Sequence, residues 1–365
     1  MGEGFTFHPL EVSFSGYSGS GKSTLISKLI PLLGLDLAYI KHDVHKFSMD
    51  HPGKDTYVVK KAGAVQVFIS NDQEQALLKT GGLNLKLASL EFLECDGVIA
   101  EGHKTSDLGK ILVLDKEGAL LKDPAFQNQI PLAVVGPDPE SPALPWKVPY
   151  FSRDDAPAVA TFLKNHWERI LDQRPLYGLV LTGGRSQRMG QDKASLDYHG
   201  QSQVRRAVDL LKPFCTQVFV SCREDQAQDP DRRDFPQIRD RFLDFGPLSG
   251  ILSAQFQEPG AAWLVTAVDL PSLDHSTLEF LIKHRNPFKF ATAFRGFEDL
   301  PEPLCTVYEP KSRQRLLQFL AQGYRCPRKM LINSPVQVLD PPDPRTLQNI
   351  NSPDERERIL NDIRR

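Results

Sequence analysis

The sequence predicts an α/β protein with two three-layer domains, each built on a mainly parallel sheet between helices. Two units of strand, glycine-rich loop and helix indicate this fold class, one beginning near Leu10 and the other near Tyr177. Around them, short apolar runs alternate with segments whose apolar residues recur at helical spacing, which is typical of parallel sheets. A length of 365 residues also favours two domains, because one hydrophobic core rarely organises so long a chain.

The expected strands are short apolar runs. In the first half they cover residues 10–15, 37–40, 97–100, 111–114 and 132–135, and in the second half 177–181, 218–220 and 263–267. A helix is expected over 24–33, after the first glycine loop, and another opens at the turn formed by residues 246–250.

The boundary between the domains depends on one helix. Prolines make residues 137–149 look like a linker, but residues 154–171 carry apolar side chains at helical spacing. That helix most simply closes the first domain, so we place the junction at Asp172–Pro175. The predicted domains are residues 1–173 and 174–365. The two glycine loops differ in pattern, which indicates a fusion and not a repeat.

Composition excludes several classes of partner and site. With a net charge of −2, the chain has no overall positive charge that would attract nucleic acid or an anionic membrane. The five cysteines are scattered without a C-x-x-C pair, so neither a disulfide framework nor a zinc site is expected. Residues 1–10 do not resemble a signal peptide, and no apolar run reaches the roughly 20 residues of a membrane span. We expect a cytoplasmic protein with reduced thiols.

The first glycine loop has the pattern G-x-x-x-x-G-K-[ST] between a strand and a helix. Backbone N–H groups in such a loop surround phosphate oxygens, and the helix N-terminus favours the anion. Lys22 would neutralise β and γ oxygens, and the hydroxyl of Ser23 would hold Mg²⁺. A nucleoside triphosphate site is predicted from Gly16, Ser18, Gly19, Ser20, Gly21, Lys22 and Ser23. The chain has no N-K-x-D motif, so these residues alone do not choose between GTP and ATP.

Two polar clusters in the first half have alternative interpretations. His42 and His45 could form a metal site with a carboxylate, but a polar loop after the strand at 37–40 is the simpler interpretation. Glu101 follows the strand at 97–100, where ligands of open α/β sheets bind. It could therefore reach the Mg²⁺ shell, or it could be a solvated loop acid, and the sequence favours neither.

The second glycine loop, Leu181 to Lys193, is the most informative segment. Gly183 and Gly184 follow a strand directly, so bare backbone can approach a base and its phosphates. Arg188 and Lys193 add two cations, which suit the charge that builds up as pyrophosphate departs.

Two aspartates belong with the second loop. Asp269 ends a buried strand and could hold a divalent cation, or it could cap the helix that follows Pro271. The phosphate loop in the same predicted sheet favours the metal. Asp240 could bind ribose hydroxyls or start a turn.

Both halves resemble families of molybdenum cofactor synthesis. Residues 177–365 resemble the molybdenum cofactor guanylyltransferases (MobA type) in T-G-G-R-S-Q-R-M-G-Q-D-K, R-D…G-P-L-S-G, V-D-L-P, P-L-C and N-I-N-S-P. Residues 5–171 resemble the molybdopterin-guanine dinucleotide biosynthesis adaptors (MobB type) in G-Y-S-G-S-G-K-S, K-H-D-V-H, D-H-P-G-K-D-T, E-G-H-K and F-S-R-D-D. The resemblance implies a P-loop NTPase-like first domain, which binds GTP as an adaptor, and a Rossmann-like nucleotidyltransferase domain after it.

The resemblance also implies the reaction and its residues. GTP and molybdopterin, with or without molybdenum, would give the guanine dinucleotide and pyrophosphate. Mg²⁺ or Mn²⁺ would be the cofactor, and molybdenum insertion proteins and recipient molybdoenzymes would be partners. Residues toward the pterin would be Asn349 and Asn351. Residues on GTP would be Leu181, Thr182, Gly183, Gly184, Lys193, Asp240 and Asp269, with Arg188, Lys193 and Asp269 catalytic, and the metal sites would include Asp269 and Ser23.

The sequence departs from the family at some positions and leaves other functions open. Thr182 stands where the family usually has alanine, and Ser221 stands where some members carry asparagine at a nucleotide contact. A sugar-phosphate nucleotidyltransferase fused to a P-loop module is the alternative enzyme, because it shares the glycine loop, R-M-G and lysine pattern. The first domain could also be a non-catalytic carrier that binds nucleotide and cofactor for hand-off.

Overall fold

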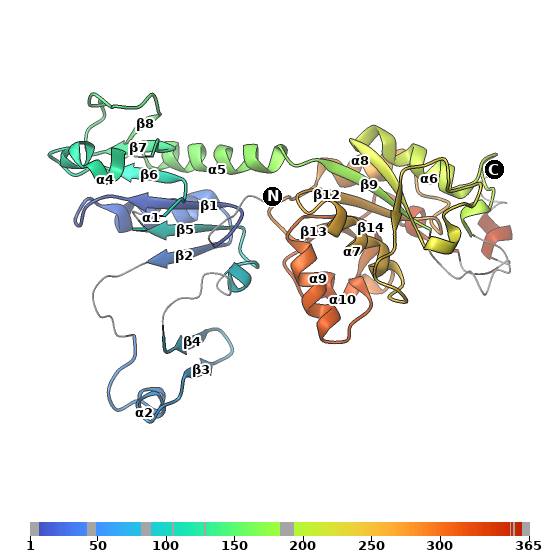
Figure 1. Cartoon of the computed structure of the whole chain (residues 1–365), viewed down its shortest axis with the longest axis horizontal. Coiled ribbons are helices and arrows are strands. Elements are labelled where there is room, and N and C mark those ends of the chain that lie inside the picture. The colour runs from blue at the N-terminus through green and yellow to red at the C-terminus, as the bar shows by residue number, and fades with distance from the viewer. Residues whose placement is uncertain are drawn as a thin grey trace. The chain divides into compact units, whose positions relative to one another are not determined.

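The computed structural model describes residues 7–41, 49–81, 89–103, 106–127, 129–182, 193–350, 352 and 355–359 (Figure 1). The chain divides into two compact units, and the division falls between Asn165 and His166. Both units are α/β, as the sequence predicts. The domain boundary at 173/174 stays a prediction, because the helix that spans the division continues to Asp172.

The first unit is built on a six-stranded sheet in the order β2-β5-β1-β6-β7-β8, and every pairing in it is parallel. Its strands are β1 Glu11–Ser15, β2 Leu37–Lys41, β5 Gly97–Glu101, β6 Lys110–Val113, β7 Ala133–Gly136 and β8 Tyr150–Ser152. The carboxyl ends of parallel strands share one edge of a sheet, so the loop after β1 lies among the segments that follow β5, β6, β7 and β8. The predicted strands are confirmed to within two residues; the edge strand β8 was not predicted.

Helices and a small ribbon complete this unit. The predicted helices appear as α1 Lys22–Leu33 and α5 Ala156–Asp172. Helix α1 buries Leu25, Ile26, Leu29 and Leu33 and ends at Gly34, whose left-handed φ of 61° stops it. The other elements are α2 Asp55–Lys61, η1 Ala119–Lys122, α4 Pro124–Gln127 and an antiparallel ribbon of β3 Gln66–Ser70 and β4 Gln75–Lys79.

The second unit has a seven-stranded sheet in the order β11-β10-β9-β12-β14-β13-β15. Its strands are β9 Leu176–Leu181, β10 Gln217–Cys222, β11 Gln237–Arg239, β12 Ala262–Ala267, β13 Ala291–Arg295, β14 Pro301–Tyr308 and β15 Gln337–Leu339. All pairings are parallel except those that β14 makes with β12 and β13. The expectation of a mainly parallel sheet is therefore confirmed, with one antiparallel strand that was not predicted.

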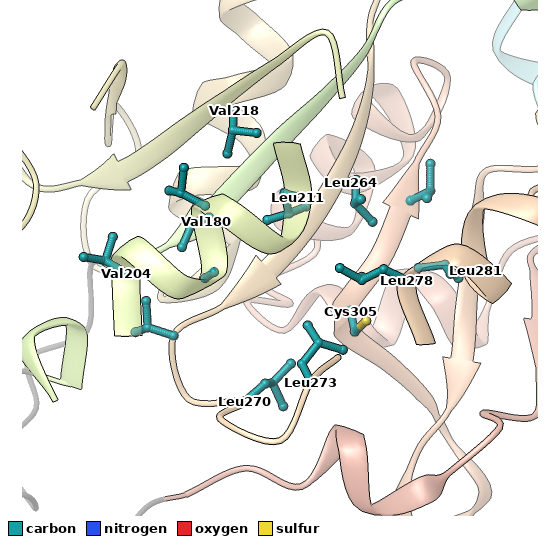
Figure 2. Close-up of a cluster of buried hydrophobic side chains, with 14 of the residues drawn as sticks. Val180, Val204, Leu211, Val218, Leu264, Leu270, Leu273, Leu278, Leu281 and Cys305 are labelled. Atoms are coloured by element: carbon teal, nitrogen blue, oxygen red, sulfur yellow. The ribbon is translucent and has the colours of Figure 1, made fainter. Parts of the chain in front are cut away.

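Helices cover both faces of this sheet. Figure 2 shows Val180 of β9 and Leu264 of β12 packed with Leu211 of α6 (Gln203–Leu211) and Leu278 of α8 (His275–Lys283). Helix α7 (Pro247–Gln257) contacts the opposite face, where Gly250 meets Leu181. The unit is completed by α9 Ser312–Ala321, α10 Pro327–Ile332 and the short helices η2 Lys193–Ser195, η3 Lys212–Phe214, η4 Glu224–Gln226, η5 Phe297–Asp299 and η6 Pro344–Leu347.

Among the helices of the described residues, none has both the length and the apolar character needed to span a bilayer. All five cysteines are free thiols, and two of them, Cys222 and Cys305, are buried.

Candidate functional site

The first glycine loop has the geometry of a phosphate loop. It runs from the end of β1 to Lys22, the first residue of α1, and it brings together all seven residues predicted to bind phosphate. Gly19 and Gly21 have φ values of 76° and 88°, which other residues rarely adopt. A β-carbon on Gly16 would lie 2.3 Å from the carbonyl oxygen of Val113. These three glycines are therefore required by the path of the backbone.

Lys22 folds back over this loop. Its Nζ donates hydrogen bonds to the carbonyl oxygens of Gly16 (3.1 Å) and Tyr17 (2.6 Å), and it lies 3.4 Å from the hydroxyl of Ser20. The ammonium charge is thus held at the loop itself. A phosphate in the loop would offer this amine negatively charged acceptors, which bind an ammonium more strongly than a carbonyl does.

Glu101 faces the phosphate loop and is not a solvated acid. The hydroxyls of Ser23 and Tyr39 donate to its Oε2 at 2.7 and 2.8 Å, and Lys41 Nζ lies 3.5 Å from Oε1. Burial acts to raise the pKa of Glu101, but these hydrogen bonds and the charges of Lys41 and Lys22 together lower it. The carboxylate therefore stays ionised beside the Ser23 hydroxyl. His42 and His45 lie outside the described residues.

Thr182, at the end of β9, is held from two sides. Its amide and its hydroxyl both donate to the carbonyl oxygen of Ser221, at 3.1 and 2.7 Å. From the other side, Arg232 donates to the Thr182 hydroxyl (Nε, 2.9 Å) and to its carbonyl oxygen (Nη2, 3.2 Å). Leu181 and Thr182 are the described residues at the start of the second glycine loop, and Gly183, Gly184 and Arg188 lie outside the described residues.

Arg232 was missed by sequence reasoning. Its side chain is only 1% exposed, and its Nη1 donates to Asp229 Oδ2 at 2.7 Å. Arg232 lies in a run of charged residues, D-P-D-R-R-D, which is typical of a solvated loop. Only the spacing of Asp229 and Arg232 hints at a local ion pair, and nothing in the sequence distinguishes Arg232 from the exposed Arg233.

Asp240 and Ser221 meet at the same edge of the sheet. The Ser221 hydroxyl donates to Asp240 Oδ1 at 2.8 Å. Burial raises the pKa of Asp240, and this hydrogen bond and the charge of Arg223 oppose the shift. Gly250 of α7 packs closely against these residues. A β-carbon at this position would lie 2.3 Å from Ser221 Oγ and 2.6 Å from Leu181 Cδ2. Leu181 ends β9, Ser221 is the second-last residue of β10 and Asp240 directly follows β11, so the three lie at one edge of the sheet.

A second group of predicted residues meets around Asp269. Lys193 Nζ lies 3.7 Å from Asp269 Oδ2 and donates to the carbonyl oxygen of Ile350 at 2.7 Å, while the Ile350 amide donates to the carbonyl oxygen of Asp269. Asn349 directly precedes Ile350 in the chain, so it is next in sequence to the residue that contacts Asp269. Asn351 lies outside the described residues.

Within the described residues, two buried oxygen atoms of this group have unused hydrogen-bonding capacity. Asp269 Oδ1 and Asn349 Oδ1 are buried and have no hydrogen-bond partner in the described part of the chain. Burial raises the pKa of Asp269, and the charge of Lys193 opposes that shift. Buried oxygens without partners are costly unless a cation or donor satisfies them, so the arrangement fits a divalent cation. The alternative that Asp269 caps α8 is wrong, because Asp274 does so by accepting from the Thr277 amide at 2.8 Å.

One further buried acid lies near Asp269 and was not predicted. Glu302 of β14 is 5% exposed and accepts from Arg328 Nη2 at 3.2 Å. Burial raises its pKa, and the negative charge of Asp269 adds to the shift. Across the described residues, no three histidine, cysteine or acidic side chains gather into a metal-binding cluster.

Two family models match the chain. Residues 11–135 match the molybdopterin guanine dinucleotide synthesis protein B family, and residues 178–337 match the MobA-like NTP transferase domain. An adapter protein of molybdopterin-guanine dinucleotide biosynthesis from Escherichia coli is 39% identical over 126 residues, which cover 32% of this chain and 70% of the adapter. A molybdenum cofactor guanylyltransferase from Pseudomonas putida is 32% identical over 184 residues, which cover 48% of this chain and 93% of the transferase.

The chain belongs to both families. Its first half belongs to the MobB family, and its second half belongs to the molybdenum cofactor guanylyltransferase family, which carries the MobA-like NTP transferase domain. A bifunctional molybdenum cofactor biosynthesis protein from Synechocystis is 39% identical over 186 residues, which cover 51% of this chain and 54% of that relative. The matched part of the chain thus spans about half the length of the bifunctional relative. The predicted family memberships are confirmed.

Proposed function

We propose that this protein transfers GMP from GTP to molybdopterin, with or without its molybdenum, and releases pyrophosphate. One observation carries this proposal: Lys193 Nζ lies 3.7 Å from Asp269 Oδ2. The two side chains meet at the edge of the sheet where β9 ends at Leu181 and the chain continues to Thr182. A cation and a carboxylate with a buried, unpartnered oxygen suit a triphosphate bound together with a divalent metal.

The roles follow from the chemistry of nucleotidyl transfer. The terminal phosphate of the pterin attacks the α-phosphorus of GTP in line, and pyrophosphate leaves. Lys193 neutralises charge on the triphosphate, and Asp240, next to Ser221, accepts hydrogen bonds from the nucleoside. Asp269 would hold Mg²⁺ or Mn²⁺, which neutralises phosphate oxygens when bound. Arg188 and the two loop glycines keep their predicted roles at the phosphates, and Asn349 and Asn351 keep theirs toward the pterin.

Mass analysis of the pterin product tests the transfer directly. The full chain is incubated with Mg²⁺, molybdopterin and GTP, ATP or CTP in separate reactions. We expect one GMP to be added to the pterin from GTP alone, with release of one pyrophosphate. A parallel reaction replaces the pterin with a sugar 1-phosphate. Turnover of GTP with the sugar phosphate but not with molybdopterin would overturn the proposal in favour of a sugar-phosphate nucleotidyltransferase.

For the first half we propose a GTP-binding adapter that assists cofactor synthesis or hand-off. Its partners would be molybdenum insertion proteins and recipient molybdoenzymes, in the cytoplasm, where free thiols such as the five here persist. The support is the Lys22 amine over the phosphate loop and the ionised Glu101 beside Ser23. Ser23 would bind Mg²⁺ directly, and Glu101 would hold the metal's water.

Two variants of the full chain test this adapter site. Lys22→Ala should abolish the nucleotide binding of the first half while GMP transfer in the second half continues. Glu101→Gln distinguishes a carrier from a GTPase in single-turnover hydrolysis of GTP. We expect hydrolysis to be slow in the parent chain and little changed in Glu101→Gln. Fast hydrolysis that depends on Glu101 would contradict the carrier role, and loss of all transfer in Lys22→Ala would contradict independent sites.

A further inference from the structure

Arg153 is the first residue after the edge strand β8, and its side chain turns back toward the centre of the sheet. Its amide donates to the carbonyl oxygen of Gly136, the last residue of β7, at 2.7 Å. The strand order β1-β6-β7-β8 puts two strands between β8 and the strand that carries the phosphate loop. Neighbouring strands lie about 4.8 Å apart, so only a long side chain could cover that distance.

The guanidinium of Arg153 ends against the phosphate loop. Its Nη2 donates to the carbonyl oxygen of Leu114, just after β6, at 2.7 Å. A β-carbon on Gly21 would lie 3.1 Å from Arg153 Cδ and 3.3 and 3.4 Å from Nη1 and Nε. No side chain therefore separates Arg153 from the backbone of Gly21, the residue that caps α1 and precedes Lys22.

The guanidinium of Arg153 has N–H donors that no described residue accepts. Its Nε is buried and has no hydrogen-bond partner, and no carboxylate in the described residues forms a salt bridge with it. The Leu114 carbonyl is the acceptor that fixes its position. A guanidinium has five N–H donors in a fixed fork, and a buried donor without an acceptor costs free energy. Phosphate oxygens are the acceptors that match this fork in geometry and in charge.

We propose that Arg153 is a second cation of the adapter's nucleotide site and donates to phosphate oxygens of the nucleotide that the phosphate loop binds. This inference rests on the proposed nucleotide site of the first half. Lys22 contacts the loop from the side of Gly16 and Tyr17, and Arg153 contacts it at Gly21, so the two cations lie against different parts of one loop. The nucleotide's phosphate chain would lie between two positive charges.

The rival role for Arg153 is a tether that fixes the end of β8 to the end of β6. The two roles differ in what they affect. A tether contributes to the folded chain whether or not nucleotide is present, so its loss lowers the melting temperature of the chain in nucleotide-free buffer. A phosphate ligand contributes when the nucleotide binds, so its loss weakens affinity and reduces the rise in melting temperature that GTP causes.

The test uses the full chain with Arg153→Met, which keeps an unbranched apolar side chain and removes the charge, and Arg153→Lys, which keeps the charge. Lys164→Met, an exposed residue of α5, is the matched control for loss of one positive charge. Because the second half also binds nucleotide, the adapter's share is the part of fluorescent GTP-analogue binding that Lys22→Ala removes. We expect Arg153→Met to weaken that share at least about tenfold, and Arg153→Lys and added guanidinium ion to restore part of it. Lys164→Met should bind as the parent does.

Two results would overturn the inference. One is unchanged binding in Arg153→Met together with a lower melting temperature in nucleotide-free buffer, which is the signature of a tether. The other is measured on the parent chain and needs no variant to fold: phenylglyoxal modification of Arg153, followed by peptide mass analysis, should be slowed by GTP, and an equal rate with and without GTP would contradict phosphate contact. If Lys22→Ala itself left GTP binding unchanged, the proposed adapter site would fail instead.

Discussion

Arg232 and Thr182 are joined by two hydrogen bonds, at 2.9 Å to the hydroxyl and 3.2 Å to the carbonyl oxygen, although they are 50 residues apart in the chain. The guanidinium is almost fully buried, so these acceptors, together with Asp229, compensate for hydration that it has lost. Thr182 stands where the guanylyltransferase family usually has alanine, which could not accept from Arg232 Nε. We infer that this arginine and this threonine depend on each other, and that together they fix the start of the second glycine loop.

A double-mutant cycle on this pair measures the dependence. Thr182→Ala leaves a buried arginine N–H without an acceptor, so it should destabilise the second unit by about 1–3 kcal/mol. Arg232→Met removes the donor as well, so the double variant should lose clearly less than the sum of the two singles. Urea titrations give the free energies of unfolding. Arg233→Met, whose side chain is 58% exposed, is the control and should change stability by less than about 0.5 kcal/mol. Additive effects in the cycle would show that the two residues act separately.

Gly250→Ala should damage the nucleotide end of the second sheet. A β-carbon there would meet Ser221 Oγ at 2.3 Å, so α7 would have to move away from β9 and β10. We expect a loss of about 1–3 kcal/mol despite the better helix propensity of alanine, and a higher KM for GTP, because the Ser221–Asp240 contact lies at the same place. Gly260→Ala, with no atom within 4 Å of its β-carbon, is the matched control. Wild-type stability in Gly250→Ala would mean that this packing is looser than described.

Asp269→Asn tests the metal carboxylate of the transferase. The amide keeps the shape of the side chain but removes its negative charge, so the chemical step should slow by about 10²–10³. The requirement for Mg²⁺ should rise as well. Pyrophosphate release at saturating GTP, measured across a Mg²⁺ titration, reports both effects. Asp274→Asn is the control, because asparagine also caps helices well and should leave turnover unchanged. Normal turnover and normal metal dependence in Asp269→Asn would remove Asp269 from the metal site.

Two fragments test the domain junction. If Asp172–Pro175 separates the domains, residues 176–365 should fold alone and retain transfer, and limited proteolysis should cut near that segment. The fragment 166–365 begins where the second compact unit begins, and it keeps Trp167, which is fully buried. Thermal melts and transfer assays compare the two. An insoluble or inactive 176–365 fragment beside a stable 166–365 fragment would move the boundary into α5.

Much of the fold could be predicted because its strands are buried on both faces. A parallel strand such as β5, with all five residues buried, contains a continuous apolar run at 97–100, which composition alone reveals. Strand β8 is half-buried, has only three residues and directly follows the proline-rich stretch 137–149, so no local pattern marked it as a strand. Strand β14 contains Pro301 and Pro303, and its antiparallel direction depends on contacts with β12 that no local pattern encodes.

The motifs predicted the candidate sites but not the contacts within them. Spacing predicted the phosphate loop because seven neighbouring residues build it. The pairing of Lys193 with the carbonyl of Ile350 joins residues 157 positions apart, and the burial of Arg232 depends on how a polar loop folds. Glu101 could be assigned only after the structure showed the Ser23 hydroxyl bonded to it.

Strand β8 has a practical consequence for isolating the adapter half. The family match ends at residue 135, but β7 is covered on its outer side by β8, with Val134 opposite Tyr150 and Val135 opposite Phe151. A fragment cut at the end of the match would leave the N–H and C=O groups of β7 that face β8 unpaired, beside two fully buried valines. Such an edge is a template for strand pairing between molecules, so the truncated adapter should self-associate and aggregate where the longer one stays dispersed.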